Sequence, residues 1–186
     1  MALVTLVKVK EYLEITGTDS DTLLQGFIDR LSAWVERYCD RIFLQATYTD
    51  EKHDGDGAKA LLVNQYPIDS VTSLFDDTLR NFGTETKIAA ADFVIYKDRG
   101  EIHLDGLTFQ KGLQNVKVTY VAGFATIPID LQQAVLELVA DRFRNKESQG
   151  IRSQAIGAFR VEYDLSELPQ EVRAVLDSYR KPKVAA

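Results

Sequence analysis

The stretch VKVTYVAGFATIPIDLQQAVLELVA, residues 116–140, contains the change of periodicity that decides the fold class. In its first part, Val116, Val118 and Tyr120 alternate with polar residues, as in a strand that has one face in water. From Asp130 onward, apolar residues recur every three or four positions, which predicts a helix with one buried face. A strand that leads directly into a long amphipathic helix indicates a mixed α+β protein.

Further short alternating segments occupy residues 45–124, with Gly, Asp and Asn at the breaks between them. Two breaks, HDGDG at 53–57 and DRG at 98–100, contain residues that tolerate positive φ and therefore predict turns. We expect five or six strands that form one small antiparallel sheet. The candidate strands are residues 46–52, 59–64, 71–75, 93–96, 101–105 and 116–120.

Both ends of the chain have helical periodicity. Residues 6–13 predict a first helix, which Thr5 can cap by accepting a hydrogen bond from a free backbone N–H. Residues 20–39 predict a second helix, capped by Ser20 or Asp19. Its expected buried stripe is Leu23, Leu24, Phe27, Ile28, Leu31, Trp34, Val35 and Tyr38, and its expected outer face is Asp21, Gln25, Asp29, Ser32 and Glu36.

After the helix that begins near Asp130, a short extended piece at 158–163 leads to a last helix, which Pro169 enters. We therefore expect an α+β fold: a helical bundle of about four helices with an inserted small antiparallel β-sheet. The expected parts are an N-terminal helical pair (1–44), a β-rich insert (45–126) and C-terminal helices (127–186) that pack with the N-terminal pair as one folded unit.

Composition narrows the class of protein. The chain has 186 residues, of which 45% are hydrophobic, which is enough apolar side chain to exclude intrinsic disorder. The net charge of -6 disfavours broad attachment to nucleic acid or to anionic lipid. A single cysteine, Cys39, cannot form an internal disulfide, and we expect it to be buried like Trp34. No signal peptide and no long apolar run is present, so we expect a soluble protein that contacts no membrane.

The sequence lacks the common catalytic and metal motifs, and no cofactor is expected. One alternative is a small carboxylate- or metal-dependent enzyme. Glu101, His103 and Asp105 alternate with apolar residues, which would place all three on one sheet face. A water-facing strand explains the same pattern without any chemistry.

Two further readings are weaker. The oxygen-rich residues Asp50, Glu51, Asp54 and Asp56, with His53 among them, could hold calcium, but a solvated hairpin tip fits their spacing better than an EF-hand loop. The first two helices could form a DNA-binding helix-turn-helix, but the second begins with acidic residues instead of the basic and amide residues that contact DNA.

Several arginines lie near the ends of predicted helices, where cations offset the negative end of the helix dipole, which is their local explanation. Arg152 and Arg160 lie around the linker after the third helix, where a run of charges is usually a solvated surface. Arginine is also enriched in protein interfaces, so the sharper reading is contact with another chain. The candidates for a partner or oligomer interface are Arg37, Arg41, Arg142, Arg144, Arg152 and Arg160.

Several segments, in their order along the chain, resemble the head-tail connector (adaptor) proteins of tailed phages. The opening is carried by TLVKVKEYLEIT (5–16), DSDTLL (19–24) and WVERYCDR (34–41). The middle is carried by VTYVAGFATIP (118–128) and LQQAVLELVA (131–140), and the end by IGAFRVEY (156–163) and LPQEVR (168–173). Because residues 45–115 exceed the hairpin of compact members, the chain resembles a longer subfamily with a β insert.

The resemblance implies a structural protein of the virion and no enzymatic activity. Members form rings of about a dozen copies beneath the portal, through head-to-tail contacts between identical chains. The implied partners are further copies of the chain, the portal protein and a tail or head-completion protein. Genomic DNA would pass through the channel without sequence-specific binding, and assembly would take place in the bacterial host cytoplasm.

Overall fold

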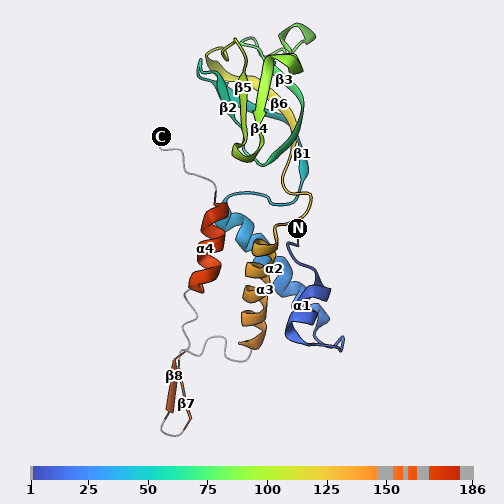
Figure 1. Cartoon of the computed structure of the whole chain (residues 1–186), viewed down its shortest axis with the longest axis vertical. Helices are drawn as coiled ribbons and strands as arrows, with labels where there is room; N and C mark the ends of the chain where they lie inside the picture. Colours follow the sequence, from blue (N-terminus) through green and yellow to red (C-terminus); the bar gives the residue numbers. More distant parts are fainter. Residues whose placement is uncertain (1, 146–152, 157–158, 163–167, 181–186) are drawn as a thin grey trace. The chain divides into compact units, whose positions relative to one another are not determined.

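The computed structural model describes residues 2–145, 153–156, 159–162 and 168–180, and it describes the side chains of 2–145 and 168–180. The chain divides into two compact units (Figure 1). The helical unit contains residues 1–41 and 127–186, and the β unit contains residues 42–126. Helices and antiparallel sheets are both present, so the predicted α+β class is confirmed.

The described part of the helical unit contains α1 (Leu6–Leu13), α2 (Asp21–Cys39), α3 (Ile129–Arg144) and α4 (Gln170–Tyr179). The Thr5 hydroxyl accepts from the backbone N–H of Lys8 and caps α1, as predicted. Ser20 occupies the N-cap of α2 but makes no capping hydrogen bond with its side chain, so that part of the prediction is wrong.

Helix α3 contacts each of the other three helices, and α2 also contacts α1 and α4. Two residues of α2 differ from the predicted pattern. Ser32, predicted on the outer face, is fully buried because its hydroxyl accepts from the backbone N–H of Leu3 at 3.0 Å. Leu23, predicted in the buried stripe, is 41% exposed. The buried residues of the three longer helices include Leu24, Ile28, Val35, Leu131, Val135, Val139, Val172 and Leu176.

The β unit contains two three-stranded antiparallel sheets, whereas the sequence predicted one. The first has the order β1-β6-β3, from β1 (Ala46–Gly55), β6 (Gly112–Ala122) and β3 (Ile68–Asp76). The second has the order β2-β5-β4, from β2 (Ala60–Leu62), β5 (Glu101–Leu104) and β4 (Phe93–Tyr96). Short 3-10 turns lie at Thr84–Thr86, Ala90–Asp92 and Lys97–Arg99.

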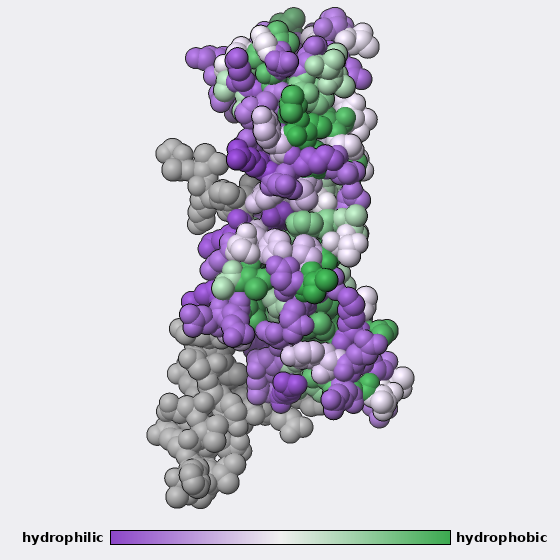
Figure 2. Space-filling model, in the orientation of Figure 1, coloured by the Kyte–Doolittle hydropathy of each residue, from purple (hydrophilic) through white to green (hydrophobic). Residues whose placement is uncertain are grey.

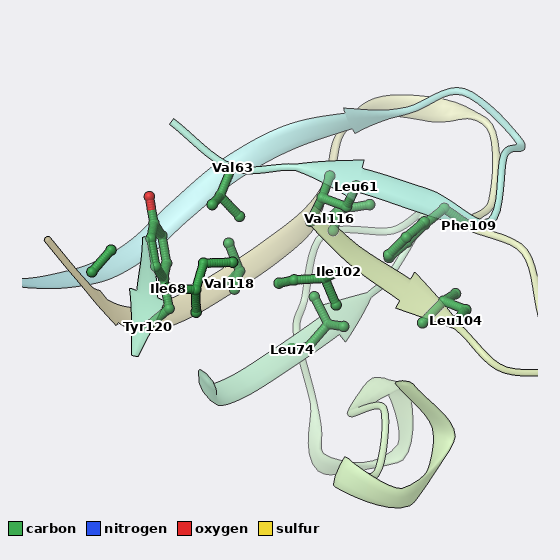
Figure 3. Packing of buried hydrophobic residues seen from close by; sticks show 11 residues of the cluster. Leu61, Val63, Ile68, Leu74, Ile102, Leu104, Phe109, Val116, Val118 and Tyr120 are labelled. Atoms are coloured by element: carbon green, nitrogen blue, oxygen red, sulfur yellow. The ribbon is translucent and has the colours of Figure 1, made fainter. Parts of the chain in front are cut away.

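The two sheets enclose one hydrophobic core (Figure 3). Val116, Val118 and Tyr120, the apolar residues of the alternating pattern in β6, are all fully buried in it. They pack with side chains from the second sheet, among them Leu61 and Ile102. Alternation along the strands therefore identified the buried face correctly, although it did not predict the division into two sheets.

Gly123 forms the turn that leaves β6. Its φ of +109° is rarely adopted by other residues, and a Cβ placed there would lie 2.6 Å from the carbonyl oxygen of Leu44. Next to it, the backbone N–H of Phe124 donates to the carbonyl of Phe43 at 2.7 Å. The glycine thus lets the two segments that end the β unit approach each other closely.

Two strands pair beyond α3, where the sequence predicted one extended piece. β7 (Ser153–Ile156) and β8 (Phe159–Glu162) form an antiparallel hairpin. β8 falls within the predicted piece at 158–163, and β7 was not predicted.

Candidate assembly surfaces

Part of the apolar stripe of α2 is not covered by other described helices. Phe27, Leu31 and Trp34 line a hollow of about 260 Å³ together with Arg30, and Arg142 of α3 completes the described lining. Phe27 is almost fully buried at its base, and the Arg30 guanidinium lies over the Phe27 ring at 5.0 Å. We call this hollow the α2–α3 groove. Its described lining is apolar, with two cationic side chains.

Arg37 and Arg41, two further arginines predicted at an interface, differ in exposure. Arg37 is exposed on the last turn of α2. Arg41 is only 5% exposed, and its guanidinium donates to the backbone carbonyl of Tyr179 at 3.3 Å. Arg41 therefore joins the end of α2 to the end of α4 within the chain, and little of it is accessible to a partner.

Arg142 and Arg144 are both exposed in the last turn of α3, where the helix dipole favours them. Only Arg142 lines the groove. Arg152 lies outside the described residues, and so does the side chain of Arg160, which is in β8. The interface role of all six arginines stays a prediction.

Helix α1 carries a second surface that the sequence analysis did not single out. Val7 is 64% exposed and lines a second hollow together with Lys10, Glu11, Glu14 and Ile15. Both glutamates are exposed. We call Val7, Glu11, Glu14 and Ile15 the α1 surface. The sequence contained a signal for it, because Val7 is three and four residues before Lys10 and Glu11 and therefore falls on a polar face of the helix.

Hydrophobic residues are also exposed elsewhere. Figure 2 shows them (green) among hydrophilic residues (purple) on the visible face. Large exposed fractions occur at Ile129 (85%), Leu79 (77%) and Leu113 (74%). When exposed apolar side chains gather in patches, they are typical of surfaces that bind other proteins.

The β unit contains a partly buried polar network around Glu51. The Tyr120 hydroxyl donates to Glu51 Oε2 at 3.0 Å, and His53 Nε2 lies 2.7 Å from Glu51 Oε1. The backbone N–H of Asn64 donates to the same Oε1 at 3.1 Å, and that of Gln65 donates to the Tyr120 hydroxyl at 3.1 Å.

This network shifts the pKa of the Glu51 carboxyl and that of the Tyr120 hydroxyl. Burial raises the pKa of the Glu51 carboxyl, but the hydrogen bonds from His53, Asn64 and Tyr120 outweigh it and hold the pKa below its ordinary value. Burial, with the nearby Glu51 charge, raises the pKa of the Tyr120 hydroxyl. The network joins β1, β6 and the segment before β3, which is a structural role.

The alternative enzymatic site is not assembled as predicted. His103 Nε2 lies 3.1 Å from Glu101 Oε2, but Asp105 follows the end of β5 and is exposed. Among the described residues, no three His, Cys, Asp or Glu side chains are grouped as they would be to hold a metal ion. Neither this triad nor the acidic residues around His53 therefore forms a candidate metal centre.

No helix in the described part of the chain is long and apolar enough to span a bilayer.

A model of the head completion protein family matches residues 2–182. The chain belongs to this family. The predicted role as a structural component of the virion's head-tail connection is thereby confirmed. A search of curated protein sequences gave no significant match.

Solved structures share the fold of this family member. The neck of an empty gene transfer agent (GTA) particle, computed with C6 symmetry, is similar with a TM-score of 0.63 and 21% identity, over 98% of this chain and 92% of that chain. The neck of a native GTA particle, computed with C12 symmetry, is similar with a TM-score of 0.55 and 21% identity, over 97% and 90%. The virion of a native GTA particle is similar with a TM-score of 0.56 and 19% identity, over 98% and 92%.

Proposed function

We propose that copies of this chain form a ring beneath the portal of a tailed-phage or prophage virion and that the tail docks on this ring. The observation that carries the proposal is the head completion family match, which extends over residues 2–182. The likeness to neck components of particles computed with C6 and C12 symmetry supports a ring of identical copies. Such a ring requires each copy to present two different surfaces, one to each neighbour.

We also propose that the protein has a structural role and no catalytic activity. The family and the similar solved structures are virion components, which supports assembly instead of catalysis. We place the protein in the host cytoplasm during assembly and in the particle afterwards. Its partners would be further copies, the portal protein and a tail or head-completion protein.

DNA would pass through the ring without sequence-specific binding. The net charge of -6 supports this part of the proposal, because an acidic protein repels the phosphate backbone and does not retain it. The purified chain is therefore expected to show no salt-dependent binding to duplex DNA.

We also propose that the helices act as one bundle into which the β unit is inserted. The division of the chain supports this view, since the helical unit draws on residues 1–41 and 127–186 and the β unit on the residues between them. In this arrangement the helical unit would form the contacts between copies, and the β unit would contact the portal or the tail.

The decisive experiment removes the gene from a phage or prophage that encodes this chain and images the particles by electron microscopy. The expected result is heads without tails, and normal tailed particles after the gene is supplied again. Purified chain added to portal rings should also give a second ring by cryo-electron microscopy. Infectious tailed particles without the gene would contradict the proposed function.

A further inference from the structure

We infer that the α2–α3 groove receives the α1 surface of a second copy of this chain, and that this contact repeats around the ring. The inference rests on the proposed function, because it specifies which residues make the ring. The residues that enter the groove are Val7, Glu11 and Glu14 of the α1 surface of the neighbouring copy.

The first argument is charge complementarity. Both charged side chains in the described lining of the groove, Arg30 and Arg142, are cationic and exposed. On the α1 surface, Glu11 and Glu14 are anionic and exposed. Lys10 lines the same hollow as these residues, but its ammonium lies 2.7 Å from the Asp21 carboxylate of its own chain, which offsets its charge. Opposite charges therefore meet when the two surfaces approach.

The second argument is the spacing of the side chains. Phe27, Leu31 and Trp34 are separated by four and three residues, which places them in one row along α2. On α1, Val7 and Glu11 are also four residues apart, and Glu14 is the C-cap residue that directly follows the helix. One helix can lie along the groove with Val7, 64% exposed, against the apolar base and the carboxylates near the arginines.

The third argument is the position of the two surfaces on the helical unit. The row in the groove continues to Tyr38, whose hydroxyl donates to Asp177 of α4 at 2.7 Å. The other flank of α2 faces the N-terminal segment, since Ser32 accepts from Leu3 and Asp21 pairs with Lys10. In Figure 1, α1 and α4 lie on opposite sides of α2 and α3.

The groove, made by α2 and α3, and the α1 surface are therefore two different surfaces of the helical unit. Two different surfaces give a head-to-tail contact, which closes into a ring when the rotation between copies permits it. A contact between two identical surfaces would give only a dimer.

Cysteine cross-linking tests the contact directly. One preparation carries Leu31→Cys in the groove and a second carries Val7→Cys on α1. Native Cys39 is fully buried and does not compete. The two preparations are mixed, assembled on portal rings and treated with a short bismaleimide. We expect a cross-link between the two variants that is at least about tenfold stronger than in a mixture of Leu31→Cys with Leu113→Cys of the β unit.

Charge reversal provides a second, independent test. Arg30→Glu with Arg142→Glu makes the groove acidic, and Glu11→Arg with Glu14→Arg makes the α1 surface basic. Each double variant alone should lose ring formation by about tenfold or more. Mixing the two should restore it, because each groove then finds a complementary α1 surface, and the quadruple variant should assemble alone. The matched control, Arg80→Glu with Arg99→Glu, makes the same charge change on exposed residues of the β unit and should leave assembly unchanged.

The outcomes separate the inference from the proposed function. Rings that form on the portal without the cross-link, and whose assembly ignores the charge reversals, would overturn the inference and leave the proposed function intact. A groove reversal that changes only the free energy of unfolding would mean that the groove is filled by its own chain, which also overturns the inference. Failure of the wild-type chain to join any portal or particle would overturn the proposed function itself.

Discussion

The Tyr120 hydroxyl donates a hydrogen bond of 3.0 Å to the Glu51 carboxylate and so links the central strand β6 to β1. The two residues are far apart in the sequence, and they meet because β1 pairs with β6. The Tyr120 ring is fully buried and stacks on Tyr48 at 5.2 Å, while its hydroxyl reaches the polar network at the edge of the core. This combination gives the β unit a pH-dependent contribution to its stability.

We predict that Glu51→Gln reduces the acid sensitivity of the β unit. The pKa of Glu51 is lowered in the folded state, so the carboxylate stabilises the fold above its unfolded pKa of about 4.3. That stabilisation is lost as the pH falls through the folded pKa. Denaturant unfolding followed by circular dichroism should show a wild-type advantage at pH 7 that shrinks below about pH 4.

The matched control for this prediction is Glu85→Gln, since Glu85 is exposed in a 3-10 turn. It should leave the dependence on pH as in the wild type. Equal dependence on pH in the wild type and Glu51→Gln would contradict the prediction.

We predict that Tyr120→Phe destabilises the β unit by about 1–2 kcal/mol. The substitution keeps the ring and its packing but removes the donor to Glu51 and the acceptor for the backbone N–H of Gln65. Unfolding curves measured at pH 7 give the difference. Tyr96→Phe is the control, because Tyr96 is 46% exposed and should change the free energy of unfolding by less than about 0.5 kcal/mol. Equal values for the two variants would refute a structural role of the hydroxyl.

We predict that Gly123→Ala destabilises the chain by at least about 1 kcal/mol. The alanine would be strained at a φ of +109°, and its Cβ would meet the backbone of Leu44 and Gln45. Gly26→Ala is the opposite control, since Gly26 lies within α2 with nothing within 4 Å of an added Cβ. It should stabilise the helical unit by about 0.5–1 kcal/mol. Thermal unfolding measures both, and a neutral Gly123→Ala would show that the turn relaxes.

We predict that Cys39 resists thiol reagents in the folded protein. Its side chain is fully buried, and burial raises the pKa of the thiol to about 11, so it stays protonated at pH 8. Reaction with Ellman's reagent should be at least about a hundredfold slower than in denaturant, where the cysteine is exposed. Trp34 is the only tryptophan, and its fluorescence reports whether the helical unit stays folded during the reaction. Rapid labelling with unchanged fluorescence would contradict the prediction.

Several elements follow from local patterns alone. The start of α3 near Asp130, the Thr5 cap of α1 and the buried face of β6 were all predicted, because each depends on residues within one turn or one strand. The division into two sheets was not predicted. Alternation reveals which face of a strand is buried, but it does not reveal which strand pairs with which.

Ser32 and the α2–α3 groove show the same limit for side chains. Ser32 is buried and accepts a hydrogen bond from the backbone N–H of Leu3, which lies 29 residues away in the sequence. Local spacing along α2 therefore could not predict its burial. Phe27, Leu31 and Trp34 were all assigned to the core from their spacing, and Phe27 is indeed buried. Leu31 and Trp34 are only half-buried, and they line a hollow beside Arg142 of another helix. The sequence indicated that Arg142 lies at the end of a helix, but it did not indicate that Leu31 and Trp34 lie beside it.

The sequence by itself determined the α+β class, the order and approximate bounds of the helices, and the resemblance to head-tail connectors. These properties are encoded in short-range periodicity, capping residues and ordered motifs, which depend on neighbours along the chain. Only the tertiary structure decided which apolar side chains are covered, which arginine is enclosed and which side chains are exposed. The reason is physical: burial depends on which distant segments pack together, and this packing brings residues of separate helices and strands to one surface.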